Sequence, residues 1–296
     1  MKMLSRRIAA AAIAALSLVT VLSSSPASAA TTARDRGEYL ALGDSVPFGY
    51  NPLLVDPPNP TPAYKYVGYP QFAASALGLH LTNLSCPGET TTSFSEADPV
   101  KAAAEDNGCR TFRSFSPLHT NYSGSQAEAA TAFLAHHPDT RLITIMLGAN
   151  DLLLCNQDPG HCANSPDEVR KVIVAAATKI GTLAGQIRGT GYSGRLVFVT
   201  YYSTDYNDVQ TTKAVAGLDQ AIAQVAQNSD LNVEVADAFN AFAAVAKYKN
   251  GDTCAAGLLI KLPNGTCDKH PSRTGALLLA GTVLYAVHQA SHSAAA

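Results

Sequence analysis

Short apolar runs and longer stretches of helical periodicity alternate along the chain. We predict strands where apolar runs are bounded by turn residues, over residues 39–42, 81–84, 142–147, 196–200 and 233–235. Apolar residues at helical spacing predict helices over residues 70–77, 125–136, 166–188, 211–227 and 272–291. Strands that alternate with helices are typical of an α/β fold, in which each helix connects two parallel strands. The pattern therefore predicts one parallel sheet with crossover helices.

The longest predicted helix has clear start signals. Ser165 is suited to cap its N-terminus, and Pro166 fits the first helical position. Asp167 and Glu168 complement the positive end of the helix dipole. We therefore expect this helix to begin at residue 166.

Two connections are unusually long for a compact domain. Residues 47–70 are rich in proline and tyrosine, and residues 88–124 are rich in serine and threonine. Loops of this length are usually functional or disordered. No internal repeat or second-domain boundary is evident, so we predict a single domain over residues 30–296.

The first 29 residues are typical of a secretory signal peptide. A basic leader, MKMLSRR, precedes the apolar run of residues 8–22, and Ala27-Ser28-Ala29 forms a small-residue cleavage site before Ala30. An uncleaved membrane anchor is less favoured, because the apolar run is short for a membrane span. The two adjacent arginines are only a weak sign of twin-arginine export. We expect a secreted, extracellular protein.

Charge and composition exclude some partners. Removal of Lys2, Arg6 and Arg7 with the leader changes the formal net charge from −2 to −5. No arginine-rich run or basic patch remains, so we expect no nucleic-acid partner.

Six cysteines in an exported chain predict three disulfides. Six cysteines allow 15 pairings, and their grouping into sequential couples favours Cys86–Cys109, Cys155–Cys162 and Cys254–Cys267. No Cys-x-x-Cys pair occurs among the six cysteines, so their spacing does not support a zinc site, and we expect no metal.

Four polar stretches lie where predicted strands end or the last helix begins. Ser45 follows the first strand in LGDSVPFG, and the others are NLSCPGETT, IMLGAND and CDKHPSRTG. Gly, Asp, Ser and Pro also form ordinary turns, so the first stretch alone is weak evidence. In a doubly wound sheet, however, ligands bind at the carboxyl ends of the strands, so the four stretches are expected at one edge.

These stretches contain the groups that acyl transfer requires. Ser45 can act as nucleophile and His270 as the base, held at the start of the last helix by Pro271. The N–H groups of Ser45 and Gly88 and the Asn150 amide can bind the oxyanion. A glycine at position 88 would let the substrate approach the backbone closely.

Taken together, the four stretches resemble the SGNH (GDSL) hydrolase family, whose blocks contribute Ser, Gly, Asn and His in this order. GDSV, CPGETT, GAND and HPS stand for the four blocks and extend over nearly all of the predicted mature chain. The chain looks most like secreted bacterial lipases and esterases of this family, which carry three sequential disulfides. The resemblance implies a flavodoxin-like three-layer α/β/α fold with about five parallel strands in the order 2-1-3-4-5, and no cofactor. No Gly-x-Ser-x-Gly elbow occurs, so the α/β-hydrolase alternative has no nucleophile.

One position departs from the family pattern. Family members usually have Asp three residues before the histidine, where this chain has Cys267, and Asp268 lies two residues before His270. Either Asp268 reaches the imidazole, or a main-chain carbonyl near Cys267 or Asp268 orients it. We favour the carbonyl, and thus a Ser-His dyad. For Asp44 we favour a role in holding the turn over a role as base.

We therefore expect a serine hydrolase that cleaves carboxylic esters of lipid-like substrates: an esterase or lipase, with phospholipase as an option. The expected partner is an ester with an acyl chain, and the expected state is a monomer, with transient contact with a lipid surface as a further option. Several aromatic and apolar residues of the first long connection either line an acyl groove or simply pack the loop, and the sequence favours neither explanation. They are Phe48, Tyr50, Leu53, Leu54, Val55 and Tyr64. The alternatives are a glycan-directed acetylesterase, against which the lack of tryptophan weighs, and an inactive binding protein.

Overall fold

The computed structural model describes residues 37–56, 59–158 and 162–293. Its main sheet consists of β1 (Glu38–Gly43), β2 (His80–Asn83), β3 (Thr140–Met146), β4 (Arg195–Val199) and β5 (Val233–Ala236). All the strand pairs are parallel, in the order β2-β1-β3-β4-β5. The five predicted strands and the order implied by the family resemblance are confirmed. The predicted signal peptide, residues 1–29, lies outside the described residues.

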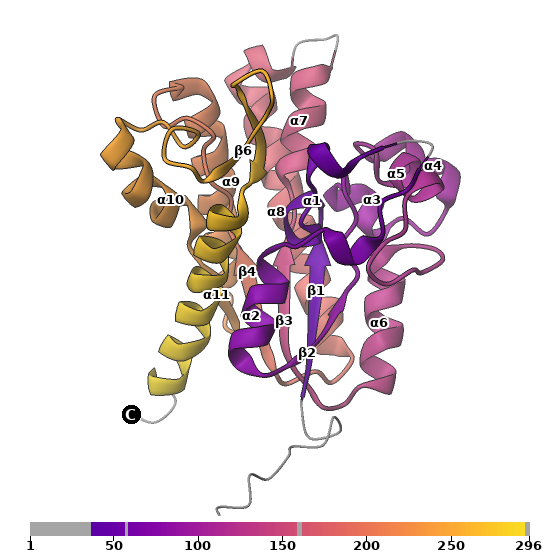
Figure 1. Cartoon of the computed structure of the whole chain (residues 1–296). Helices are drawn as coiled ribbons and strands as arrows, with labels where there is room; N and C mark the ends of the chain where they lie inside the picture. The colour runs from indigo at the N-terminus through magenta and orange to yellow at the C-terminus, as the bar shows by residue number, and fades with distance from the viewer. Residues whose placement is uncertain (1–36, 57–58, 159–161, 294–296) are drawn as a thin grey trace, which may run out of the picture.

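Helices cover both faces of this sheet (Figure 1). Helices α2 and α11 pack against each other on one face, whereas α8 packs against α6 and α9 on the other. The helices are α1 (Ser45–Phe48), α2 (Tyr69–Leu77), α3 (Thr91–Ser95), α4 (Pro99–Glu105), α5 (Cys109–Phe115), α6 (Gln126–His136), α7 (Ala149–Gln157), α8 (Pro166–Gly189), α9 (Val209–Ala226), α10 (Ala238–Ala246) and α11 (Arg273–Ser293). Short 3-10 turns are η2 (Pro52–Leu54), η3 (Ala63–Lys65), η4 (Cys162–Asn164) and η5 (Lys247–Lys249). The architecture is the predicted α/β/α sandwich.

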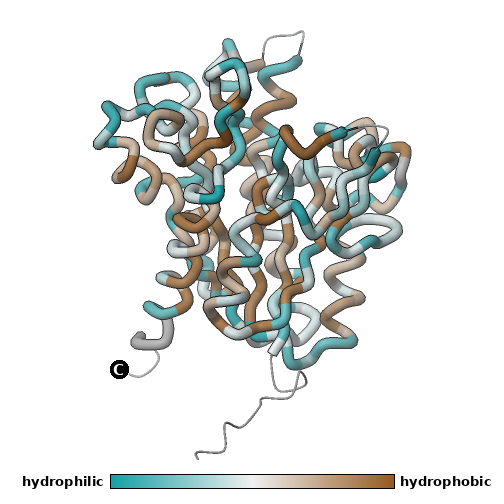
Figure 2. Tube along the Cα trace, in the orientation of Figure 1, coloured by the Kyte–Doolittle hydropathy of each residue, from teal (hydrophilic) through white to brown (hydrophobic). Residues whose placement is uncertain are grey.

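The core lies along the central strands. In β3 every residue except Arg141 is buried, as expected for a parallel strand covered on both faces. Figure 2 shows hydrophobic positions concentrated in the middle of the molecule. The buried Thr144 forms hydrogen bonds with the hydroxyls of Tyr39, at 2.8 Å, and Tyr69, at 3.2 Å. These bonds satisfy a polar group that would otherwise be costly to bury.

The long connection over residues 88–124 is more ordered than the sequence indicated. It contains α3, α4 and α5, of which Thr90 caps the first and Asp98 the second. The disulfide Cys86–Cys109 joins the start of α5 to the loop after β2. Side-chain caps and a covalent link hold these short helices, so no long amphipathic pattern was there to predict them.

The start of α8 and the disulfides agree with the sequence predictions. Ser165 caps α8, because its side chain accepts a hydrogen bond from the Glu168 N–H. The pairings Cys155–Cys162 and Cys254–Cys267 are present, which confirms the disulfide prediction. Within the described ranges, no helix is long and apolar enough to span a membrane.

A second, small sheet was not predicted. It is an antiparallel pair formed by β6 (Leu259–Lys261) and β7 (Cys267–Pro271) just before α11. Both strands are short, and β7 consists mainly of polar residues, so β7 lacks the apolar run by which the other strands were recognised. Because β7 carries His270, this sheet determines the geometry of the candidate site.

Candidate active site

Ser45 lies directly beyond the carboxyl end of β1, as the first residue of α1. Gly43 makes the turn possible, because its φ is +132° and a Cβ there would lie 2.0 Å from the Met146 carbonyl oxygen. The Asp44 carboxylate accepts a hydrogen bond of 2.9 Å from the Val46 N–H and so caps α1. The interpretation of Asp44 as a residue that holds the turn is confirmed. Ser45 itself remains partly exposed.

His270 reaches Ser45 across 225 positions of the chain. Its Nε2 lies 2.8 Å from the Ser45 Oγ, a distance suited to proton transfer. His270 is 6% exposed. It lies shortly before the last helix, as expected, but it belongs to the unpredicted strand β7, three residues before α11 begins. The pairing of β7 with β6 thus positions the imidazole.

The carboxylate of Asp268 contacts the other nitrogen of the imidazole ring. Asp268 Oδ1 forms a hydrogen bond with His270 Nδ1, and also accepts one of 2.9 Å from the His270 backbone N–H. Our preference for an orienting main-chain carbonyl near Cys267 or Asp268 is therefore wrong. The reason is local: residues 268 and 270 belong to a strand, and side chains two residues apart on a strand lie on the same face.

The electrostatics of Asp268 agree with this contact. Burial opposes its ionisation, but the hydrogen bonds and the charge of His270 outweigh burial and hold the pKa of Asp268 below its usual value. An ionised carboxylate at Nδ1 keeps the proton on that nitrogen and leaves Nε2 free to accept one from Ser45. The arrangement can therefore generate a serine nucleophile.

The predicted oxyanion donors lie in the same neighbourhood. The Asn150 side chain, near the start of α7, donates from Nδ2 to the Glu89 carbonyl at 2.9 Å and to Asp44 Oδ2 at 3.4 Å. Asp44 precedes Ser45, and Glu89 follows Gly88. Asn150 therefore links the nucleophile turn to the loop of Gly88.

Gly88 is constrained by the backbone that surrounds it. Its φ is +88°, and a Cβ there would lie 2.4 Å from the carbonyl oxygen of Asn107. The Asn107 N–H donates to the Gly88 carbonyl at 2.7 Å, and its side-chain amide donates to Asn150 Oδ1 at 2.9 Å. We had assigned the need for glycine to substrate approach, but the packed Asn107 backbone already requires it.

A buried polar network supports this edge of the sheet, and the sequence interpretation missed it. The Gln126 side chain on α6 accepts from the Gly43 N–H at 2.7 Å and donates to the Gly43 carbonyl at 3.0 Å. It also donates to the Glu89 carboxylate at 3.1 Å. Burial raises the pKa of Glu89, and hydrogen bonds together with Arg110 oppose this increase. The network fixes the backbone two residues before Ser45.

Two tyrosines that directly follow β4 were also missed. The Tyr201 hydroxyl donates to Asp44, and the Tyr202 hydroxyl donates to the Lys269 carbonyl at 2.9 Å, next to His270. Their position after the fourth strand was the available signal, because the carboxyl ends of all the parallel strands meet at this edge.

The Asp151 carboxylate, directly after Asn150 on α7, accepts hydrogen bonds from the N–H and the hydroxyl of Thr91. It therefore links the start of α7 to the start of α3, and its own backbone N–H is a further donor to it. Burial raises the pKa of Asp151, and the bonds from Thr91 oppose this increase.

The connection between α1 and α2 provides the residues proposed for an acyl groove. Phe48 is fully buried in a cluster with Tyr66 and Phe112, so packing explains it. The ring of Tyr50 lies 4.7 Å from that of His270, between centroids. Leu53 and Tyr64 are exposed by 52% and 75%. Phe48 therefore does not line an open groove, whereas apolar side chains nearby do face solvent.

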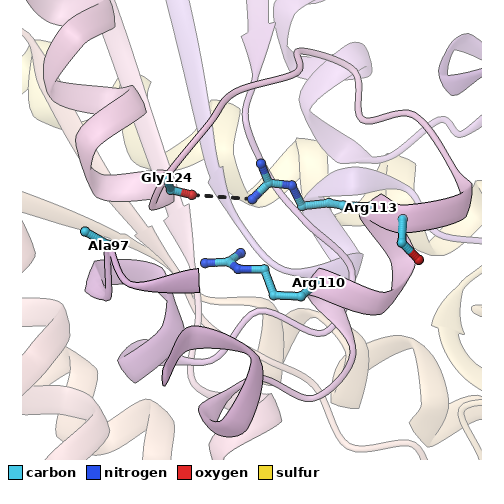
Figure 3. Close-up of a pocket in the computed structure, with 5 residues that line it drawn as sticks. Ala97, Arg110, Arg113 and Gly124 are labelled. Atoms are coloured by element: carbon cyan, nitrogen blue, oxygen red, sulfur yellow. Dashed lines mark hydrogen bonds between the residues drawn. The ribbon is translucent and has the colours of Figure 1, made fainter. Parts of the chain in front are cut away.

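Two cavities in the described part of the chain lie apart from Ser45 and His270. One, of about 310 Å³, is lined by Arg110 and Arg113 of α5, with Gly124 opposite (Figure 3). The other, of about 870 Å³, lies between α6 and the end of α8. The potential ligand atoms of Cys86, Glu89 and Cys109 also cluster, but the two sulfurs are bonded to each other and are therefore not available as metal ligands.

Comparisons with solved structures show the fold. A lipase from a goat rumen metagenome has a TM-score of 0.52 at 15% identity and covers 84% of this chain and 97% of its own. An extracellular lipase from Streptomyces rimosus has a TM-score of 0.52 at 16% identity, with 84% and 99% coverage. A variant of an acetyl-xylooligosaccharide esterase from Geobacillus stearothermophilus has a TM-score of 0.51 at 16% identity, with 85% and 94% coverage. No curated protein matches the chain.

The family model of the GDSL-like lipase/acylhydrolase family matches residues 41–277. This range includes the four polar stretches around Ser45, Gly88, Asn150 and His270, together with all five strands except the first residues of β1. The resemblance inferred from those stretches is thereby confirmed. The chain belongs to the GDSL-like lipase/acylhydrolase family, and its class of activity is ester hydrolysis.

Proposed function

We propose that this protein is a secreted serine hydrolase that cleaves carboxylic esters with lipid-like acyl chains through an acyl-enzyme on Ser45. The observation that carries this proposal is the contact of 2.8 Å between Ser45 Oγ and His270 Nε2, with the Asp268 carboxylate on Nδ1 of the same ring. The nucleophile thus contacts the base, and the base contacts the group that orients it.

In the proposed reaction, Ser45 Oγ attacks the ester carbonyl carbon while His270 Nε2 takes its proton. The tetrahedral intermediate collapses, and the imidazolium returns the proton to the departing alcohol. Water then attacks the acyl-enzyme, with His270 again as base, and releases the acid and the free serine. The Asp268 carboxylate stabilises the imidazolium in both halves of the cycle.

Negative charge develops on the carbonyl oxygen in each tetrahedral intermediate. We assign the N–H groups of Ser45 and Gly88 and the Asn150 amide as the donors that stabilise it. The link that Asn150 makes between Asp44 and Glu89 supports this assignment, because it holds the three donors on adjoining segments.

The preference for acyl chains rests on the apolar side chains of the connection that follows the nucleophile helix α1. The exposed side chains of Leu53, Tyr64 and Val67 belong to the connection that begins at α1. Apolar walls are usual for lipid-like ligands, and contact with a lipid surface would use the same side chains. Three disulfides support export, because such bonds persist in oxidising compartments.

The mechanism is tested by removing the nucleophile. Ser45→Ala should fold normally and lose several powers of ten in kcat, and it should no longer react with a fluorophosphonate probe. Ser95→Ala, which changes an exposed serine of α3, should keep both properties. Near-normal turnover by Ser45→Ala would show that another residue is the nucleophile.

The substrate class is tested with p-nitrophenyl esters of increasing acyl length. A lipid-acting enzyme should show kcat/KM rising from acetate to medium or long acyl chains. A maximum at acetate, together with release of acetate from an acetylated oligosaccharide, would instead support a glycan-directed acetylesterase.

A further inference from the structure

Tyr201 is a buried residue at the edge of the site, held at both its backbone and its hydroxyl. It lies just after β4 and is 5% exposed. Its backbone N–H donates to Asp219 Oδ1 of α9 at 2.9 Å. Its hydroxyl donates to Asp44 Oδ2, and the backbone of Ala149, the residue before Asn150, is a further hydrogen-bond partner of that hydroxyl. Tyr201 does not contact Ser45 or His270 in any hydrogen bond of the described residues.

The two carboxylate oxygens of Asp44 accept hydrogen bonds from different donors. Oδ1 accepts from the Val46 N–H at 2.9 Å, whereas Oδ2 accepts from Tyr201 and from Asn150 Nδ2. The bond from Asn150 is 3.4 Å long, at the weak end for an N–H donor. The hydroxyl of Tyr201 is therefore the principal donor to Oδ2.

This division determines what the Asn150 amide can do. One hydrogen of Nδ2 is committed to the Glu89 carbonyl at 2.9 Å, and the other is held only by the long bond to Asp44. A buried carboxylate oxygen that lacks its main donor pays a desolvation penalty and would draw the remaining N–H closer. That N–H would then be less available to an oxyanion.

We propose that Tyr201 is a positioning residue for the oxyanion site: its hydroxyl satisfies Asp44 Oδ2 and so leaves one N–H of Asn150 available to the negative oxygen of the intermediate. This inference rests on the proposed function, in which Asn150 is an oxyanion donor. Tyr201 acts through Asp44 and Asn150, and does not touch the ester.

The first test is Tyr201→Phe, which removes only the hydroxyl. Loss of one oxyanion donor lowers kcat by about 10²–10³-fold, so partial withdrawal of the Asn150 N–H should lower kcat on the order of tenfold. KM should stay within about twofold, because the donor acts on charge that forms only in the transition state.

The matched control is Tyr39→Phe. Tyr39 is also a buried tyrosine, near the start of the central strand β1, and its hydroxyl is bonded to Thr144 rather than to Asp44. Both variants should show a similar fall in Tm, but Tyr39→Phe should keep kcat within about twofold of the wild type. Equal kcat in the two variants would overturn the proposal.

The second test asks whether Tyr201 acts through Asn150. In an Asn150→Ala background the N–H that Tyr201 protects is gone, so adding Tyr201→Phe should lower kcat no further. A full additional loss in the double variant would show that Tyr201 acts elsewhere and would overturn the proposal.

The same variants distinguish failure of the proposed function from failure of the proposed role of Tyr201. If Ser45→Ala retains turnover, the acyl-enzyme mechanism is wrong, and the role of Tyr201 is rejected with it. If turnover depends on Ser45 while Tyr201→Phe behaves like Tyr39→Phe, the role of Tyr201 alone is rejected.

Discussion

At the scale of single residues, the site depends on the contact between the Asp268 carboxylate and the imidazole of His270. Whether the two side chains can meet depends on whether the chain turns or extends between them. Since β7 is a strand, Asp268 lies on the same side as His270 and contacts Nδ1. We expect Asp268→Ala to lower kcat by about 10⁴-fold, because the imidazole loses both its orientation and its compensating charge.

Lys269→Ala is the matched control for this change. Lys269 lies between the two site residues on the same strand, and its side chain is exposed. Steady-state kcat on a soluble ester should be unchanged in Lys269→Ala, while His270→Ala should be nearly inactive. A loss below about tenfold in a folded Asp268→Ala would restore the account in which a main-chain carbonyl orients His270.

At the scale of elements, the parallel strands were predictable and the support of His270 was not. Strands β1, β3 and β4 carry apolar residues in short runs, and their burial follows from that composition. By contrast β7 is polar, and its position comes from pairing with β6, from the disulfide Cys254–Cys267 and from the Tyr202 hydroxyl. Such tertiary restraints leave no periodic signal in the sequence.

The disulfide at β7 should therefore matter for activity as well as for stability. Replacing Cys254 and Cys267 together with alanine should lower the free energy of unfolding by roughly 2–4 kcal/mol. It should also lower kcat, because the strand that carries His270 loses its covalent anchor.

Replacing the pair Cys155 and Cys162 in the same way provides the comparison. That disulfide joins α7 to η4, so its loss should reduce Tm with a much smaller effect on kcat. Urea unfolding and kcat measured on both double variants check this prediction. Equal effects on kcat would mean that the Cys254–Cys267 bond has no specific role in placing His270.

At the scale of the whole molecule, the site edge contains a layer of buried and partly buried acidic groups next to a partly exposed serine. Asp44, Glu89 and Asp151 all lie in it, and burial is the main cause that raises the pKa of each carboxyl. The sequence placed these acids near strand ends but could not show that they are buried together, because that depends on how the loops after β1, β2 and β3 pack.

This layer predicts how stability depends on pH. Burial raises the pKa of Asp44 from 3.8 to about 7, against the opposing effect of the Tyr201 hydrogen bond. A carboxyl whose pKa is higher in the folded state holds its proton more tightly there, so its stabilising contribution is complete below about pH 4 and is lost as pH rises through about 7. Asp268 has a lowered pKa, and its contribution is lost only on acidification below its normal range, outside this window.

We therefore expect the free energy of unfolding, measured with urea, to fall between pH 5 and pH 8. Asp44→Asn removes the titrating group while keeping an oxygen to cap α1, so its decline over the same range should be shallower than that of the wild type. Identical slopes in the two proteins would mean that Asp44 does not titrate in this range.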